Sequence, residues 1–427
     1  MFFDDADVSN LSAPPSDRRA TKLACYEQSA DGARILRHIQ LRDGSLATSS
    51  VAIDRELQNK DDLHQAFDAA WLKASLAPPA PPIIRSDVRI VDLFSGCGAL
   101  SLGIAEACRA LSLKAEHVFA SDINPAALNV FARNFPSAIV SSQPAESLVK
   151  AVGSRTSAKE RQLLATLGSI DLLAGGPPCQ GHSDLNNHTR RKDPRNSLFG
   201  VMIRFAELLR PKHVLIENVP GVRHDLGGVT DNGRHVLEKM GYSVFEAVLT
   251  ASDFGAAQRR RRYVMVATKG QFDFDALVRV ERERNVRWAC ADLVDTSRVG
   301  NLDSHAASSK VNKARIDYLF DNDLLDLPNE MRPPCHRLKR HSYNSVYGRL
   351  SWDTPAPTIT SGFNSPGQGR FVHPQARRTL TPHEAARIQS IPDFFNWGDS
   401  NRESLTQMIG NAVPPALAYA VALEMLR

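Results

Sequence analysis

Apolar and polar positions follow an alternating strand-and-helix pattern over the larger, C-terminal part of the chain. Short apolar runs typical of buried strands recur at 88–94, 117–123, 170–174 and 213–217. The first two precede helical stretches at 99–111 and 125–134. This alternation predicts βαβ units and a mostly parallel sheet, and therefore an α/β fold. Two later runs, 242–250 and 263–267, predict a closing antiparallel pair, and a helix is expected over 414–426.

The N-terminal part follows a different pattern. Residues 33–53 alternate like a pair of strands, and 54–76 predict a helix with Asp54 as its N-cap. Four prolines then fall within 78–82. Because proline continues neither a helix nor a central strand, this stretch predicts a semi-rigid linker. We expect residues 1–84 to form a small accessory or dimerisation module that ends in this linker.

Composition and charge narrow the class of protein without indicating a function. Apolar residues make up 42% and charged residues 23% of the 427 residues, as in ordinary soluble globular proteins. The formal charge is only +5, but residues 1–84 carry 12 acidic and 9 basic side chains, against 35 and 43 in the rest. A mildly basic body permits a nucleic-acid partner but does not by itself indicate one.

The cysteines and the apolar runs indicate a compartment. Six cysteines without a CxxC pair, in a chain of this length, argue against a disulfide framework. The acidic N-terminus has no signal-peptide pattern, and no apolar run reaches the about 18 residues of a spanning helix. We therefore expect a protein of the reducing cytoplasm with no membrane partner, and no metal site is predicted.

A glycine-containing turn follows the first predicted strand. It consists of Phe94-Ser-Gly96-Cys-Gly98-Ala-Leu100-Ser101, and Ser101 stands where a dinucleotide fingerprint needs its third glycine. No Walker loop follows either. Asp122 ends the second strand, where a carboxylate suits the diol of a ribose. A nucleoside cofactor without phosphate, such as S-adenosylmethionine, fits a close turn and an acid, and a plain strand–helix turn with a surface aspartate fits them as well.

Cys179 differs from the other cysteines in its surroundings. It lies in Gly176-Pro-Pro-Cys-Gln-Gly-His-Ser183 directly after the third strand, where two prolines stiffen the backbone. Most cysteines are small core residues, which is the interpretation for the other five. A loop between Pro-Pro and Gln-Gly is a poor place to bury a side chain. A thiolate presented here would be a nucleophile.

Charged groups follow at the same edge of the predicted sheet. Glu217 ends the fourth strand, and a carboxylate in that position faces the ligand crevice of an α/β sheet. Four arginines follow at 259–262. On a strand, Arg260 and Arg262 share one face and the other two share the opposite face. A run of arginines is ordinarily a solvated surface, but beside a cysteine loop and a glutamate a role in the site is favoured.

From Arg89 onward, these elements in this order resemble the DNA (cytosine-5-)methyltransferase family. The resemblance rests on collinear motifs, which are Asp92-Leu-Phe-Ser-Gly-Cys-Gly98, Pro177-Pro-Cys-Gln180, Glu217-Asn-Val219, Gln258-x-Arg-x-Arg262 and Gly410-Asn-Ala-Val-Pro414. It implies a Rossmann-like, S-adenosylmethionine-dependent methyltransferase sheet with a small, irregular target-recognition domain. The expected parts are the N-terminal module (1–84), the catalytic domain (85–268), the target-recognition region (269–345) and a C-terminal return to the catalytic domain (346–427).

The resemblance also assigns catalytic roles. Carbon 5 of cytosine is a poor nucleophile until the Cys179 thiolate adds to carbon 6, which creates an enamine whose carbon 5 can attack the sulfonium methyl. Glu217 would hold or protonate N3 and Arg262 would bind O2, where negative charge develops. Arg260 would lie near the Cys179 loop and support the thiolate. The target atoms are inaccessible inside a duplex, so the base would have to be flipped out.

The expected cofactor site draws on several motifs. The resemblance places Asp122 on the ribose of S-adenosylmethionine, where the family often has a glutamate, and Ile123 against the adenine. The other expected contacts are Phe94, Gly96, Gly98, Leu100, Pro177, Leu198, Asn411 and Val413. The acidic contact to adenine that usually ends the third strand is not evident, and Gln143 and Glu146 are the candidates.

Basic residues in the target-recognition region predict contacts with double-stranded DNA. The expected DNA-binding residues are Gln258, Arg332, Arg337, Lys339 and Arg340. Cognate restriction or defence-system proteins are further candidate partners.

One alternative is an RNA substrate such as a tRNA loop. Another is a catalytically inactive DNA-binding homologue, which the intact Cys179, Glu217 and Arg262 disfavour. A nicotinamide dehydrogenase is disfavoured by the missing third glycine.

Overall fold

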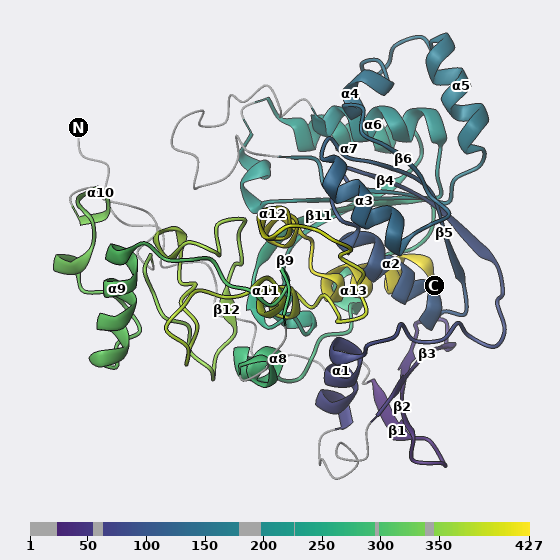
Figure 1. Ribbon diagram of the computed structural model, residues 1–427. Helices are drawn as coiled ribbons and strands as arrows, with labels where there is room; N and C mark the ends of the chain where they lie inside the picture. The colour runs from purple at the N-terminus through teal and green to yellow at the C-terminus, as the bar shows by residue number, and fades with distance from the viewer. Residues whose placement is uncertain (1–23, 54–62, 179–197, 226, 295–298, 338–345) are drawn as a thin grey trace, which may run out of the picture.

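The computed structural model describes residues 24–53, 63–178, 198–225, 227–294, 299–337 and 346–427. A seven-stranded sheet forms its centre, in the order β6-β5-β4-β7-β8-β11-β9. The strands are β4 (Asp87–Leu93), β5 (Lys114–Ser121), β6 (Ile139–Ser141), β7 (Leu172–Gly175), β8 (His213–Asn218), β9 (Ser243–Thr250) and β11 (Arg261–Thr268). Figure 1 shows helices on both faces of this sheet. The predicted α/β class is confirmed.

The direction and burial of the strands explain their hydrophobic patterns. The five strands from β4 to β8 run parallel, whereas β11 lies antiparallel between β8 and β9. Strands β4, β7 and β8 are buried over most of their length, which explains their continuous apolar runs. Because parallel strands point the same way, the residues that follow their carboxyl ends lie along one edge of the sheet.

Two groups of helices cover the sheet. On one face, α2 (Ala99–Ala110) packs against α13 (Pro415–Leu426) and the sheet. A Cβ on Gly103 would lie 2.4 Å from the Pro415 carbonyl oxygen, so glycine permits this close approach. The opposite face is covered by α4 (Ala145–Leu148), α6 (Leu198–Leu209) and α7 (Val229–Lys239), with α5 (Ala158–Leu167) against α6. The helix α3 (Pro125–Asn134) has the predicted bounds.

The N-terminal module consists of a three-stranded antiparallel sheet and one helix. Its elements are β1 (Cys25–Gln28), β2 (Arg34–Gln40), β3 (Leu46–Ala52) and α1 (Leu63–Lys73). The sequence predicted only a strand pair and missed β1, whose residues are mostly polar and exposed. The predicted N-cap Asp54 lies outside the described residues. Ile39, Leu41 and Ala47 belong to the buried cluster that contains α2 and α13, so the module packs on these two helices.

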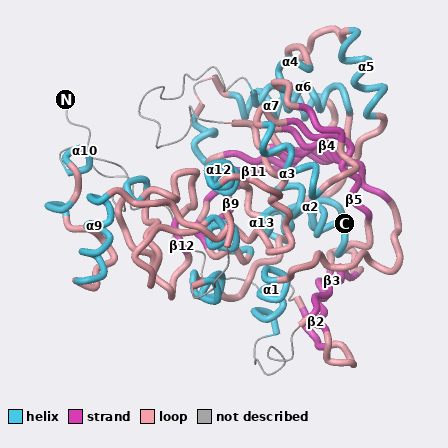
Figure 2. Tube along the Cα trace, in the orientation of Figure 1, coloured by secondary structure: helices cyan, strands magenta, loops and turns pink. Residues whose placement is uncertain are grey.

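The predicted irregular region is partly helical. Its described part contains α8 (Val286–Cys290), α9 (Lys310–Asp321) and α10 (Pro334–Arg337), joined by the loops that Figure 2 shows in pink. The C-terminal return carries β12 (Ala356–Pro357), which pairs with β10 (Gln258–Arg259), and the helices α11 (Pro382–Ile388) and α12 (Arg402–Asn411). Among the described residues, no single helix is long and apolar enough to cross a membrane, and only α12 and α13, bent by 41°, meet that criterion as a pair.

The structure describes five of the six cysteines. Cys97, Cys108 and Cys290 are buried, as expected for core residues. Cys25 and Cys335 are exposed, so the core interpretation is wrong for these two. Both lie in short elements, β1 and α10, in which no residue is fully buried.

Candidate active site

The carboxyl edge of the sheet brings together most of the residues that the motifs singled out. In the order of the sheet, the strand ends contribute Asp122, the turn 94–98, residues 176–178 and Glu217. Arg262 reaches the same edge because β11 is antiparallel and therefore begins there. Cys179, the expected nucleophile, lies outside the described residues.

Glu217 and Arg262 form an ion pair at this edge. Arg262 Nε lies 2.7 Å from Glu217 Oε1, and each side chain is only 12% exposed. Gly176 lies close to the same carboxylate, because a Cβ built on it would stand 3.2 Å from Glu217 Oε2. The segment that leads to Cys179 therefore starts beside the carboxylate that Arg262 binds.

Asn218 holds the start of the Cys179 loop. Its buried side chain donates from Nδ2 to the Pro177 carbonyl oxygen at 3.2 Å and accepts from the Val219 backbone N–H at 2.8 Å. The loop after β7 is thereby tied to the end of β8. The sequence motif contains Asn218, but nothing in its position along the chain indicates that it binds Pro177.

The arginine run alternates as predicted. Arg260 is buried and Arg262 half-buried, whereas the other two arginines are exposed. Arg260 donates to the carbonyl oxygens of Ile359 at 2.7 Å and Gly410 at 3.1 Å. It thus connects the β10–β11 junction to the C-terminal return. Its expected closeness to the Cys179 loop stays a prediction.

The placement of Gln258 corrects the expectation that it contacts DNA. Its side chain is fully buried, donates to Gln389 and accepts from the Ile359 backbone N–H at 3.1 Å. Gln389 in turn donates to the Ile409 carbonyl oxygen at 2.6 Å. A buried amide that is bonded at both ends holds the core together and does not face a DNA surface.

The turn after β4 has the geometry of a ligand-binding turn. Phe94, Gly96 and Gly98 adopt positive φ angles of 56°, 54° and 94°. Nothing lies within 4 Å of a Cβ added to Gly96, so the space above this glycine can take a ligand. Asp122 accepts from the Gly96 backbone N–H at 2.9 Å, and the neighbouring Ile123 side chain is 71% exposed. An open turn, an acid and an exposed apolar side chain fit the ribose and adenine of a nucleoside cofactor.

We expect Gly98→Ala to destabilise the protein. The backbone there is left-handed, and the added Cβ would lie 2.7 Å from the Phe135 ring and 2.9 Å from the Phe131 ring. Strain and overpacking together should lower the free energy of unfolding by about 2–4 kcal/mol, as measured by urea denaturation. Gly96→Ala is the control, because its φ is also positive but nothing lies within 4 Å of its added Cβ. Equal losses in the two variants would show that the ring contacts are not the cause.

A second buried carboxyl lies beneath the turn. Asp92 is fully buried, and its Oδ2 accepts from Ser101 Oγ at 2.7 Å. Its other oxygen has no hydrogen-bond partner among the described residues. Burial, together with the nearby Asp122, raises the pKa of Asp92 to about 7. Burial also raises the pKa of Asp122. Ser101, noted in the sequence only as the missing glycine, is therefore the partner of Asp92.

Asp92→Asn is expected to remove a pH dependence of stability. A carboxyl whose folded pKa is raised stabilises the fold fully below its unfolded pKa of about 4, and this stabilisation is lost as the pH rises through about 7. Between about pH 4 and pH 8, the wild-type free energy of unfolding should fall relative to that of the variant by up to about 4 kcal/mol. Urea denaturation over this range measures the difference, and parallel curves would contradict the expectation.

The remaining expected cofactor contacts differ in burial. The Leu100 side chain is buried in the cluster shared with α13, which leaves its backbone for a contact at the turn. Pro177 is buried and tied to Asn218. The half-buried or exposed residues are Leu198, Val413, Asn411 and the two candidates for the adenine contact, Gln143 and Glu146.

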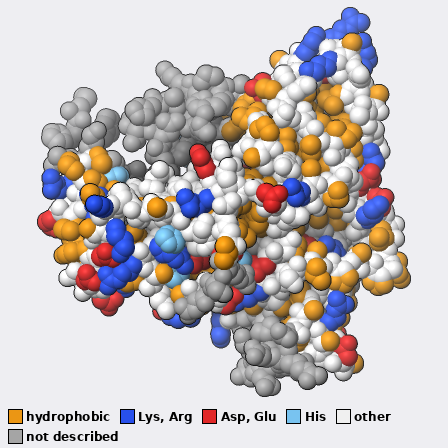
Figure 3. All heavy atoms as spheres, viewed as in Figure 1, with side chains coloured by type: hydrophobic (Ala, Val, Ile, Leu, Met, Phe, Trp, Pro, Cys, Tyr) orange, Lys and Arg blue, Asp and Glu red, His pale blue; other side chains and the backbone are white. Residues whose placement is uncertain are grey.

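The basic residues expected to bind DNA are described only in part. Arg337 is exposed in α10, whereas Arg332 is half-buried and donates to the Leu327 carbonyl oxygen at 3.0 Å. Lys339 and Arg340 lie outside the described residues. On the face shown in Figure 3, positive and negative side chains are interspersed around α9.

The fold and the site together define the class of protein. An α/β sheet carries an open glycine turn with an aspartate, and a glutamate–arginine pair, along one edge, beside the start of the segment that leads to Cys179, as expected of a base methyltransferase. A family model described as C-5 cytosine-specific DNA methylase matches residues 88–427. The chain belongs to this family and is a DNA (cytosine-5-)methyltransferase, which confirms the resemblance seen in the sequence.

Individual relatives agree with the family. The chain is 46% identical over 405 residues to the Type II methyltransferase M1.BsuMI of Bacillus subtilis (strain 168), covering 93% of this chain and 94% of that protein. It is 31% identical to the Type II methylase M.HgiDII of Herpetosiphon aurantiacus, over 79% of this chain and 95% of that protein. The solved structure of the S. pombe Dnmt2 methyltransferase has the same fold, with a TM-score of 0.55 at 18% identity. The match covers 79% of this chain and 98% of that one. The 93% coverage extends into residues 1–84, ahead of the family match.

Proposed function

We propose that this enzyme transfers a methyl group from S-adenosylmethionine to carbon 5 of a cytosine flipped out of double-stranded DNA, through a covalent adduct of Cys179 at carbon 6. The observation that most supports this proposal is the ion pair of Glu217 and Arg262, in which Arg262 Nε lies 2.7 Å from Glu217 Oε1. The pair lies beside Gly176, which precedes Cys179 by three residues. S-adenosylmethionine supplies an electrophilic methyl group when bound. The turn 94–98, Asp122 and Ile123 are the residues that would hold it.

The protein groups act in the following order. The Cys179 thiolate forms a bond to carbon 6, which moves negative charge toward N3 and O2 and makes carbon 5 a nucleophile. Glu217 holds or protonates N3, and Arg262 binds O2. Because the pair is already formed within the edge of the sheet, both groups stand ready where the charge develops. After methylation of carbon 5, loss of its proton and cleavage of the bond to Cys179 release 5-methylcytosine and the free thiolate.

The biological role that we propose is DNA modification. The names of both relatives, M1.BsuMI and M.HgiDII, include "Type II", which supports a methyltransferase that protects its recognition sequence from a cognate restriction or defence-system protein. A reducing cytoplasm suits this role, since Cys179 must stay a free thiol. Arg332, Arg337, Lys339 and Arg340 are proposed to contact the DNA.

One experiment reads activity and target together. Genomic DNA from a methylation-deficient host that expresses the chain is sequenced for 5-methylcytosine. We expect methylation at one short recognition sequence, and none from a Cys179→Ser variant. Labelled methyl transfer to duplex DNA and to tRNA is measured with the purified enzyme. Label in tRNA alone would establish the RNA alternative, and DNA binding without any label would identify an inactive homologue.

A further inference from the structure

The helix α1 of the N-terminal module lies where the recognition region leaves the catalytic domain. Residues 284–293, here called the stem, include α8 and lead from the catalytic sheet toward α9. Figure 1 shows α1 beside α8, below the catalytic sheet. The family match starts at residue 88, so the contacts of α1 are a feature of this chain beyond the part that defines the family.

The first contact of α1 is an ion pair with the stem. Asp68 Oδ2 lies 2.7 Å from Arg284 Nη2, and the Arg284 side chain is only 1% exposed. The Arg284 guanidinium also lies 5.5 Å from the centre of the Trp288 ring, whose Nε1 donates to the Gln65 carbonyl oxygen at 3.5 Å. A guanidinium removed from water needs a counter-charge. Asp68 supplies it, and this fixes the stem to α1.

The last turn of α1 contacts both sides of the junction. Lys73 Nζ lies 2.8 Å from Asp292 Oδ1 of the stem. Trp71 Nε1 donates to Glu106 Oε2 of α2 at 3.2 Å, and its ring packs edge-on against Phe394 at 5.7 Å between centroids. Since α2 begins at the cofactor turn, α1 bridges the stem and the helix that carries that turn.

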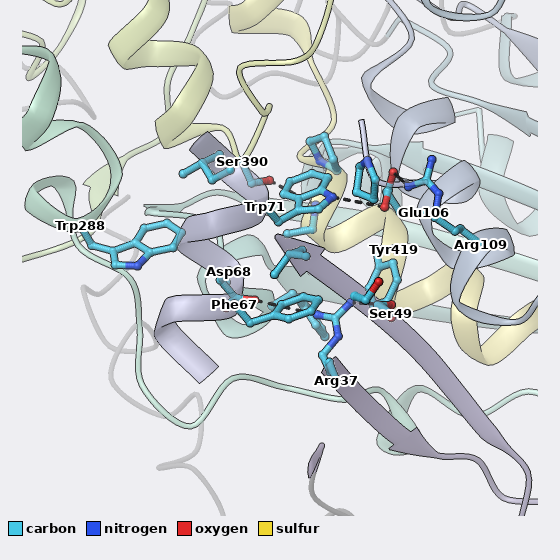
Figure 4. A pocket seen from close by; sticks show the side chains of 18 residues that line it. Arg37, Ser49, Phe67, Asp68, Trp71, Glu106, Arg109, Trp288, Ser390 and Tyr419 are labelled. Atoms are coloured by element: carbon cyan, nitrogen blue, oxygen red, sulfur yellow. Dashed lines mark hydrogen bonds and ion pairs between the residues drawn. The ribbon is translucent and has the colours of Figure 1, made fainter. Parts of the chain in front are cut away.

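Arg37 of β2 attaches the module to α13. Its guanidinium carbon lies 4.5 Å from the centre of the Phe67 ring and 4.7 Å from that of Tyr419 in α13. Figure 4 shows these side chains and Asp68 around a cavity. The acidic side chains that line the cavity are paired with arginines of the protein, including Asp68 with Arg284. The cavity therefore lies within the interface between the N-terminal module and the rest of the protein, and we assign no ligand to it.

We propose that the N-terminal module is a positioning element of the methyltransferase. Through Asp68–Arg284 and Lys73–Asp292, α1 holds the stem, and with it the recognition region, in one orientation relative to α2 and α13. The recognition region binds the DNA, whereas Glu217 acts on the flipped base. A small displacement between the two parts therefore misplaces the base relative to the reacting groups, and catalysis tolerates such a displacement poorly. This inference rests on the methyltransferase activity of the family.

The test is Asp68→Asn in the full chain. We expect kcat/KM for a duplex with the recognition sequence to fall about 10–100-fold, because the flipped base is no longer held in register. Discrimination against a duplex with one mismatched position should fall as well. The Kd for S-adenosylmethionine should stay within about twofold, since the cofactor turn is intact. Asp353→Asn is the matched control. It removes an exposed carboxylate 3.2 Å from Arg287 of the same stem and should leave all three quantities unchanged.

A milder variant separates positioning from stability. Lys73→Met removes a pair whose side chains are 35% and 42% exposed, so it should fold with little change in melting temperature. We expect a loss of kcat/KM for DNA in the same direction, about threefold or more. If Asp68→Asn only lowers the melting temperature, or does not fold, and Lys73→Met keeps wild-type kcat/KM and discrimination, the proposal is overturned. If the wild-type enzyme transferred no methyl group to any duplex, that result would instead refute the proposed function.

Discussion

Cys179→Ser is expected to abolish methyl transfer, with a loss of about 10⁴–10⁶-fold in rate, while binding of S-adenosylmethionine stays near wild type. A serine hydroxyl is far less acidic and less nucleophilic than a thiol, so it does not add to carbon 6 of cytosine. The rate is measured as labelled methyl incorporated into a duplex in a single turnover, and cofactor binding is measured by calorimetry.

The covalent step can also be observed directly. With a duplex that contains 5-fluorocytosine, the wild-type enzyme should remain attached to DNA under denaturing electrophoresis, because fluorine on carbon 5 cannot leave as the proton does. Cys179→Ser should form no such adduct. Cys335→Ser, which changes an exposed cysteine in α10, is the matched control and should behave as wild type. Full activity of Cys179→Ser would rule out the covalent mechanism.

Glu217→Gln is expected to lower kcat by about 10²–10⁴-fold, with a smaller effect on KM for DNA. The amide keeps the size of the side chain, but it neither carries the charge that pairs with Arg262 nor supplies a proton to N3. Single-turnover methylation with saturating duplex and cofactor isolates the chemical step from product release.

The control for Glu217→Gln comes from the neighbouring part of the sheet. Glu246 of β9 is 15% exposed and lies 2.9 Å from Arg234 Nη2. It therefore resembles Glu217 in burial and in pairing with an arginine, but it lies in the middle of its strand. Glu246→Gln should keep wild-type kcat. If Glu217→Gln instead kept its kcat and raised only KM for DNA, the carboxylate would serve binding and not the chemical step.

Much of the sheet could be predicted from the sequence because its central strands are buried on both faces. Their residues form continuous apolar runs, and the turns between strand and helix carry glycine or proline. The strands β1 and β6 were missed for the opposite reason. They are short and largely exposed, with Ile139 51% exposed in β6, so no burial pattern marks them.

The sequence predicts the placement of a residue well where that placement depends on local structure. Asp122 and Glu217 lie at strand ends, and every parallel strand end reaches the same edge. Gln258 shows the limit of this reasoning. Its partners Gln389 and Ile359 lie 131 and 101 residues further along the chain. A local pattern contains no information about such partners, so the sequence alone predicts a DNA contact where the structure has a buried hydrogen-bonded amide.

The C-terminal return has a consequence for the timing of activity during protein synthesis. Residues 410–426 leave the ribosome after all the segments on which they pack, yet Arg260 binds the Gly410 carbonyl oxygen and α13 covers α2. A nascent chain can form the sheet earlier, but it lacks one wall of the proposed cofactor site until these residues emerge. We therefore expect chains whose synthesis stops before residues 410–426 to have no methyltransferase activity. A cell would then gain DNA methylation only from chains whose synthesis includes α13.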